Sequence, residues 1–138
     1  MNLKNYKYTK LIYIINSIQE NGLIGSESIY IFNNISVSNI ITNGYGLFKF
    51  ENKNAQFNNV RLDNVKNVGD INDSSIIYFD SGDENKTLIF DNINITNCES
   101  NGNIIKILGN INTIEIKDSE ISNNDSYGSI FNIESKNV

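Results

Sequence analysis

Few residues of this 138-residue sequence could do chemistry, because it contains no His and a single Cys, Cys98. Without His, the usual base and metal ligand at neutral pH are missing, and one Cys excludes an internal disulfide or a cysteine-based zinc cluster. Arg61 and Asp63 are two residues apart, so both would point to one face of a strand. Such a pair could combine a cation with a carboxylate, but an exposed Arg–Asp pair is usually a surface ion pair that contributes little. We therefore predict no catalytic residue and a chain that is not an enzyme.

Acidic residues also gather in a stretch rich in turn-forming residues. They are Asp70, Asp73, Asp80, Asp83 and Glu84. Loops rich in oxygen ligands can bind Ca²⁺, but this spacing fits neither an EF-hand nor a nonapeptide calcium repeat. We interpret the stretch as solvated acidic loops and predict no metal site and no cofactor.

The overall charge and the hydropathy pattern exclude two classes of partner. The formal net charge is −5, with 11 Lys and Arg residues against 16 Asp and Glu residues. Nucleic-acid binding needs a basic surface, so this balance argues against it. No apolar run reaches the roughly 18 residues of a membrane span. We expect neither a nucleic-acid partner nor a membrane-spanning segment.

The elements that would position these side chains follow from an internal repeat. Residues 87–97 match residues 113–123 without a gap, at an offset of 26 residues. Two further copies precede these, so that the successive steps are 25, 33 and 26 residues. Equivalent positions form columns, of which the first is Phe32, Phe57, Phe90 and Ile116. A period of this size indicates a stacked repeat.

Each copy contains three short pieces in which apolar and polar residues alternate, as in residues 55–57, 60–62 and 77–79. Such alternation is typical of strands, and the Gly, Asn, Asp and Ser between the pieces are typical of turns. Three strands per copy would close one coil of a parallel β-helix, each strand pairing with its equivalent about 4.8 Å away. We predict an all-β fold, a right-handed parallel β-helix (solenoid) of about four to five coils over residues 29–138.

Residues 1–28 fit the repeat poorly and are predicted to form an irregular or helical N-terminal cap. The apolar residues between positions 11 and 18 would share one face of a helix that begins after Thr9. A strand is an equal alternative, because residues 11–15 read Leu-Ile-Tyr-Ile-Ile, which is rich in β-branched and aromatic residues. Periodicity does not separate these alternatives over so short a run.

Asn recurs in one column of the repeat. The column consists of Asn39, Asn64, Asn97 and Asn123. An inward Asn at a corner could bond to the backbone of its own turn and to the Asn one coil further on. We predict that this column is a structural Asn ladder that satisfies polar groups inside the coil.

A column of apolar residues directly before the second strand of each copy is the sharpest candidate for a binding surface. It consists of Leu47, Ile76, Ile104 and Ile130. Strict alternation would place this column outside, beside Lys49, Tyr78 and Lys106, with Tyr45 and Tyr127 nearby. An exposed apolar stripe of this kind would mark a partner surface. The alternative is that glycines turn the corner, so that two consecutive residues both point inward.

The pattern Phe/Ile-x-Asn-x-x-Ile/Val-x-Asn, with Gly46, Gly102 and Gly128 before the second strand, resembles the right-handed parallel β-helix superfamily of pectin-lyase-like proteins. The resemblance covers about residues 29–138 and implies a fold. Polysaccharide lyases of this superfamily hold Ca²⁺ with carboxylates on the outer face of one sheet, whereas its glycosidases cluster two or three carboxylates. Here Asp63 and Glu120 would lie two coils apart, about 9–10 Å, with no third acid beside them.

The Asn- and Ile-rich strands, with turns such as Asn-Cys-Glu-Ser-Asn-Gly at residues 97–102, are also similar to repeats of the very large scaffoldins of anaerobic gut fungi. That resemblance implies a cohesin-like module that holds dockerin-bearing enzymes in a cellulosome. We therefore predict a non-catalytic protein-binding or structural module of a large extracellular or cell-surface assembly, with a dockerin-like protein partner. The alternative is a fragment of a carbohydrate-active β-helix enzyme or a carbohydrate-binding domain.

Overall fold

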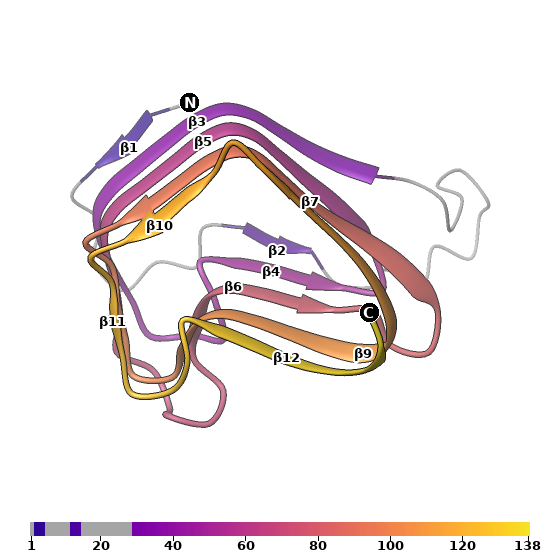
Figure 1. Cartoon of the computed structure of the whole chain (residues 1–138). Coiled ribbons are helices and arrows are strands. Elements are labelled where there is room, and N and C mark those ends of the chain that lie inside the picture. Colours follow the sequence, from indigo (N-terminus) through magenta and orange to yellow (C-terminus); the bar gives the residue numbers. More distant parts are fainter. Residues whose placement is uncertain (1, 5–11, 15–28) are drawn as a thin grey trace.

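A computed structural model describes residues 2–4, 12–14 and 29–138, which form a parallel β-solenoid of about four turns (Figure 1). No helix occurs in this part of the chain. The strands are β1 (Asn2–Lys4), β2 (Ile12–Ile14), β3 (Ile29–Thr42), β4 (Phe48–Glu51), β5 (Asn54–Asn67), β6 (Ser75–Asp80), β7 (Asn85–Thr96), β8 (Glu99–Ser100), β9 (Asn103–Lys117), β10 (Glu120–Ser122), β11 (Asp125–Ser126) and β12 (Phe131–Asn137). The predicted all-β solenoid is therefore confirmed.

The register of the strands follows the sequence repeat. β3, β5, β7 and β9 are successive neighbours in the sheet, and every pair is parallel. The register brings Phe32 onto Phe57, Phe57 onto Phe90 and Phe90 onto Ile116, which is the predicted column. Each strand therefore pairs with the strand that occupies the same position in the repeat, one coil away.

Aromatic rings fill the interior of the first coils. The rings of Phe32 and Phe57 are stacked with centroids 5.2 Å apart, and Phe90 continues the column at 5.5 Å from Phe57. Phe48 meets Phe57 edge-on from the opposite side of the coil at 5.1 Å. Offset-stacked and edge-on arrangements are the favoured ones for aromatic pairs, so the column stabilises the stack beyond its burial of apolar area.

The corners of the coil are formed by single residues in the left-handed conformation. Among the described residues, the non-glycine positions with positive φ are Asn34, Asn39, Asn52, Asn59, Asn64, Asn92, Asn97, Asp118 and Asn123. Asn tolerates this conformation better than most L-residues, because its short polar side chain can hydrogen-bond locally. The backbone of a long strand such as β3 therefore bends at each Asn with positive φ and continues along the next face of the coil.

The predicted Asn ladder lies at these corners, but its four residues are exposed, so the predicted inward orientation is wrong. In this ladder, Asn64 Nδ2 donates to Asn39 Oδ1 at 2.6 Å, whereas Asn97 Nδ2 donates to Asp63 Oδ1 at 2.9 Å. A second exposed ladder runs through a neighbouring corner. Its bonds join Asn59 to Asn34 at 2.6 Å and Asn92 to Asn59 at 3.3 Å. The ladders face solvent because the positive φ that turns the corner points these side chains outward.

Two further findings concern the strands. Residues 12–14 of the predicted cap form β2, which pairs with β4, so the strand alternative holds at these positions and the helix alternative does not. β1 pairs with β3. The remaining residues of the 1–28 cap lie outside the described part of the chain. Each coil also has a fourth short side, where Lys66 pairs with Glu99 and Glu99 with Asp125. A two-residue strand shows no alternation, so the sequence pattern missed it.

We predict that replacing the corner residue Asn64 by Ala destabilises the fold by about 2 kcal/mol, because an ordinary L-residue at positive φ costs about 1–2 kcal/mol and the ladder bond is also lost. Asn64→Gly should cost under about 1 kcal/mol, because Gly adopts this φ freely. Urea denaturation gives both values. Asn58→Ala is the matched control, since Asn58 also bonds one coil away, to Asn33 at 2.7 Å, without positive φ. Equal losses for Asn64→Ala and Asn64→Gly would show that the hydrogen bond, not the corner, dominates.

Candidate functional site

The predicted apolar stripe does not lie on the surface. Leu47, Ile76 and Ile104 are each 0% exposed, so their predicted outward orientation is wrong and the alternative, two consecutive inward residues, holds. The backbone hydrogen bonds between coils continue here, because Leu47 N–H donates to the Ile76 carbonyl oxygen at 2.9 Å. Ile130 is half-exposed, because it lies in the last coil and has an adjacent coil on one side only.

Close approach of the coils explains this departure from alternation. A Cβ added at Gly102 would lie 2.1 Å from the backbone oxygen of Ser74 in the adjacent coil. One at Gly46 would lie 2.8 Å from the backbone oxygen of Phe48 in its own turn and 3.5 Å from that of Ile76 in the adjacent coil. The chain turns tightly at these glycines because no side chain intervenes. Two consecutive apolar residues then both face the interior. They are Leu47-Phe48, directly after Gly46, and Ile104-Ile105, which follow Gly102-Asn103, and all four are buried.

The polar members of the predicted stripe do not form a free surface either. Lys49 and Tyr78 are buried, and Lys49 Nζ lies 2.7 Å from Glu51 Oε1, 4.2 Å from the ring centroid of Tyr45 and 5.0 Å from that of Tyr78. Burial, aided by Asp80, raises the pKa of Tyr78 to about 12. Lys106 Nζ donates to the backbone oxygen of Asn72 at 2.8 Å. This cation–π cluster joins neighbouring coils and is structural.

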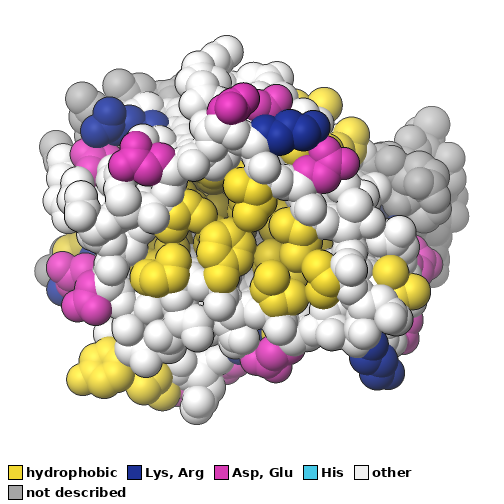
Figure 2. Space-filling model, viewed as in Figure 1, with side chains coloured by type: hydrophobic (Ala, Val, Ile, Leu, Met, Phe, Trp, Pro, Cys, Tyr) yellow, Lys and Arg dark blue, Asp and Glu magenta, His cyan; other side chains and the backbone are white. Residues whose placement is uncertain are grey.

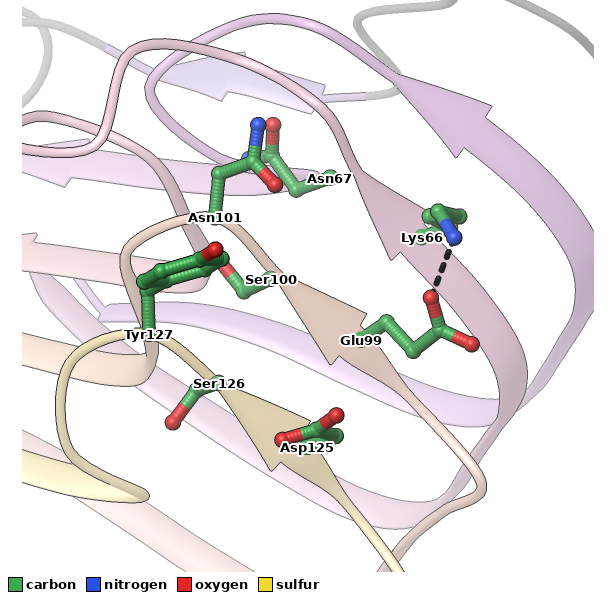
Figure 3. A pocket seen from close by; sticks show the side chains of 8 residues that line it. All are labelled: Lys66, Asn67, Glu99, Ser100, Asn101, Asp125, Ser126 and Tyr127. Atoms are coloured by element: carbon green, nitrogen blue, oxygen red, sulfur yellow. Dashed lines mark hydrogen bonds and ion pairs between the residues drawn. The ribbon is translucent and has the colours of Figure 1, made fainter.

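A polar groove of about 550 Å³ runs along the fourth, short side of the coil (Figure 3). Its lining residues are Lys66, Asn67, Glu99, Ser100, Asn101, Asp125, Ser126 and Tyr127. Lys66 and Glu99 form an exposed ion pair across adjacent strands, and Asp125 lies one coil further on, in register with Glu99. Tyr127 projects from the loop after β11 and is 82% exposed. The groove therefore offers one aromatic ring, charges of both signs and amides.

Buried amide bonds hold the groove floor rigid. Asn67 Nδ2 donates to the backbone oxygens of Ser75 at 2.6 Å and Gly44 at 2.9 Å, and Asn67 Oδ1 accepts from Gly69 N–H at 3.0 Å. Ser100 Oγ accepts from Gly102 N–H at 3.2 Å. The polar side chains of the floor are therefore occupied by hydrogen bonds within the protein. The exposed Lys66–Glu99 pair and Tyr127 remain as the groups that could contact a ligand.

Apolar residues reach the surface at the C-terminal end of the solenoid. Figure 2, viewed along the coil axis, shows hydrophobic side chains gathered in the centre of this end and ringed by polar and charged groups. The exposed apolar residues of the last coil include Ile116, Ile130 and Ile133, and Ile114, Ile121 and Phe131 are half-buried beside them. These residues continue the interior columns, whereas Ile111 lies on the exposed Asn85.

The strands of the last coil have a partner on one side only. β10 pairs with β7, β11 with β8 and β12 with β9. Their other edges carry backbone N–H and C=O groups that no strand of the described residues covers. An unpaired edge of this kind is where a following coil would pair. The groove along the fourth side is formed within the coils, and we therefore regard it as the candidate functional site.

The carboxylates considered for catalysis are tied to protein groups. Asp63 accepts from Asn97 at 2.9 Å and from Thr96 at 3.3 Å, and Arg61 lies 3.6 Å away; the Asn97 amide contributes most to lowering the pKa of Asp63. Glu120 accepts from Ser122 Oγ at 2.6 Å. Among the described residues, no group of three or more His, Cys, Asp or Glu side chains could hold a metal ion.

No family model matches the chain, and no curated protein or solved structure matches it. The geometry of the groove therefore carries the functional argument. In the part of the chain that the structure describes, no helix is long and apolar enough to cross a membrane.

We predict that the free energy of unfolding falls at alkaline pH. Burial raises the pKa of the Cys98 thiol to about 11, as it raises that of Tyr78 to about 12. A pKa raised by folding gives stability that is present below the unfolded pKa, about 8.5 for Cys, and is lost as the pH rises toward the folded value. Urea denaturation between pH 8 and 11 measures the loss, and Cys98→Ala should reduce it. A flat profile, or rapid alkylation of native Cys98 at pH 8, would contradict this assignment.

Proposed function

We propose that the chain is a non-catalytic, protein-binding or structural β-solenoid module of a larger extracellular assembly, and that it binds through the groove along the fourth side of the coil. The observation that carries this proposal is the exposed Tyr127 ring beside the exposed Lys66–Glu99 ion pair in this groove. Aromatic residues are enriched where proteins bind one another, and charged groups around them select the partner.

The most concrete version of this function is a cohesin-like scaffoldin module that holds dockerin-bearing enzymes. It is supported by the resemblance of the turn at residues 97–102 and of the Asn-rich corners to scaffoldin repeats. The side-chain bonds of Asp63 and Glu120 are consistent with a non-catalytic role, because both carboxylates already accept hydrogen bonds from neighbouring strands or from their own strand. An extracellular or cell-surface location follows from this version.

We predict that Glu99→Lys weakens binding of a purified dockerin module to the immobilised chain about two- to fivefold, because it replaces the Lys66–Glu99 ion pair of the groove by two positive charges. Glu99 is exposed, and circular dichroism checks that the variant is folded. Glu84→Lys is the matched control, because Glu84 is also exposed and also pairs with a Lys, Lys86, but does not line the groove. Equal binding by both variants would exclude the groove as the binding site. Depolymerisation of a polysaccharide by the chain would exclude a non-catalytic function.

A second candidate function, carbohydrate binding, is favoured by one observation. Tyr127 presents an almost fully exposed ring at the mouth of a groove lined by hydroxyls, amides and the Lys66–Glu99 pair. An aromatic ring offers an apolar face to the C–H groups of a sugar, while polar groups around it can bond to the hydroxyls.

We predict, for this second function, that Tyr127→Ala abolishes retention of the chain by an insoluble polysaccharide, whereas Tyr127→Phe keeps it. The ring face is common to Tyr and Phe, so the pair separates stacking from loss of the hydroxyl. Affinity electrophoresis in polysaccharide gels measures the retention. Migration that is unchanged by the polysaccharide in the wild-type chain would exclude this function.

A further inference from the structure

The two rims of the groove differ in their chemistry (Figure 3). One rim is charged and consists, in successive coils, of Lys66, Glu99 and Asp125. The other rim lies two residues further along each coil and carries Asn101 and the ring of Tyr127. The floor between the rims consists of Asn67, Ser100 and Ser126. A ligand that enters the groove therefore contacts charges on one side and an aromatic ring on the other.

The charged rim contains a carboxylate that the protein does not neutralise. Lys66 pairs with Glu99 in the adjacent coil, and Asp125 lies on the far side of Glu99, two coils or about 9–10 Å from Lys66. The Asp125 carboxylate forms no hydrogen bond or ion pair with another described residue. Like charges directly opposite each other on neighbouring strands repel. A cation bound beside Asp125 would relieve its repulsion with Glu99.

A second contact between carboxylates of adjacent coils shows how the protein itself compensates such repulsion. Asp80 lies on Glu51 in the register of β4 and β6. Lys49 Nζ lies 2.7 Å from Glu51 Oε1, and Asp80 Oδ1 accepts from Gly82 N–H at 2.9 Å. Both carboxylates are thus occupied by groups of the protein. Of these two contacts, the one in the groove is the one that leaves a carboxylate available to a ligand.

The aromatic rim suits the same kind of ligand. The Tyr127 side chain is 82% exposed, and its backbone lies two residues from Asp125, about 7 Å along the chain. A cation is attracted to the face of such a ring. A guanidinium group is planar, so it stacks on an aromatic face and also donates two parallel hydrogen bonds to a carboxylate. An ammonium group is a compact point charge and lacks this combination. Arginine is therefore the side chain that uses both rims.

We infer that the groove binds an arginine side chain of a protein partner, with the guanidinium over the Tyr127 ring and donating to the Asp125 carboxylate. This inference rests on the proposed use of the groove for protein binding and names the chemistry of the partner. The net charge of −5 favours the approach of a basic segment. A sugar would contact the ring without needing the charge of Asp125.

A titration of the isotope-labelled chain with a capped peptide Gly-Ser-Arg-Gly-Ser, followed by NMR at low salt, tests the inference. We expect saturable shifts of the amide signals of residues 99–101 and 125–127, and binding that weakens as salt is raised. The same peptide with citrulline, which keeps the planar shape but not the charge, should not bind, and the lysine peptide should bind more weakly than the arginine peptide. Equal binding of the citrulline and arginine peptides, or shifts confined to residues outside the groove, would overturn the inference.

Variants of the two rims assign the contacts. Asp125→Asn and Tyr127→Ala should each raise the dissociation constant of the arginine peptide about two- to fivefold, the effect expected of an exposed ion pair or cation–π contact. Tyr127→Phe should bind as the wild type does. Asp73→Asn is the matched control for charge, because Asp73 is also exposed but does not line the groove. Equal losses from Asp73→Asn and Asp125→Asn would show general attraction to an acidic chain and overturn the inference. Circular dichroism checks the fold of each variant.

The outcomes also separate this inference from the proposed function. Binding of a dockerin module that Glu99→Lys weakens, but that Asp125→Asn and Tyr127→Ala leave unchanged, would overturn the inference while the proposed function stands. Binding of the arginine peptide in the groove without binding of a dockerin module would support the inference and count against the cohesin-like version. Retention by a polysaccharide that depends on Tyr127 but not on Asp125, without binding of the arginine peptide, would overturn the inference in favour of carbohydrate binding.

Discussion

The parallel register between successive coils is the constraint on which the rest of the structure depends. Because each residue lies on its equivalent one coil away, a residue type that suits one coil must suit the next. The Phe32–Phe57–Phe90 column satisfies this condition by ring contacts at 5.2 Å (stacked) and 5.5 Å (tilted), and the exposed Asn ladders satisfy it by amide bonds. Like placed on like works for apolar and amide groups but repels for charges. Lys66 on Glu99 avoids this repulsion, whereas Asp125 on Glu99 does not.

The corners decide which side chains face inward. Single Asn residues at positive φ bend the long strands and point outward, whereas glycines such as Gly102 allow the coils to approach so closely that two consecutive residues turn inward. Both effects act against strict alternation. Together they place Leu47, Ile76 and Ile104 in the core and the Asn ladders in solvent.

A solenoid built in this way has a side surface along which the backbone is paired from coil to coil. Among the described residues, four of the five ion pairs join residues two apart in the sequence, and Lys66–Glu99 alone joins adjacent coils. That pair lies in the groove beside Tyr127, which combines an exposed ring with charges of both signs.

The sequence by itself determined the repeat, the strands, the solenoid and the Phe32–Ile116 column, because a local alternation and a fixed period leave few ways to bury every copy. It did not determine the direction of a residue next to a corner, since that depends on a backbone dihedral and on how closely the adjacent coil approaches. Ile104, which strict alternation places outside, is buried, and Asn39, predicted inside, is exposed. Tertiary structure alone also decided the fourth side of the coil and the groove along it, because both arise from residues that are far apart in the chain and adjacent only after stacking.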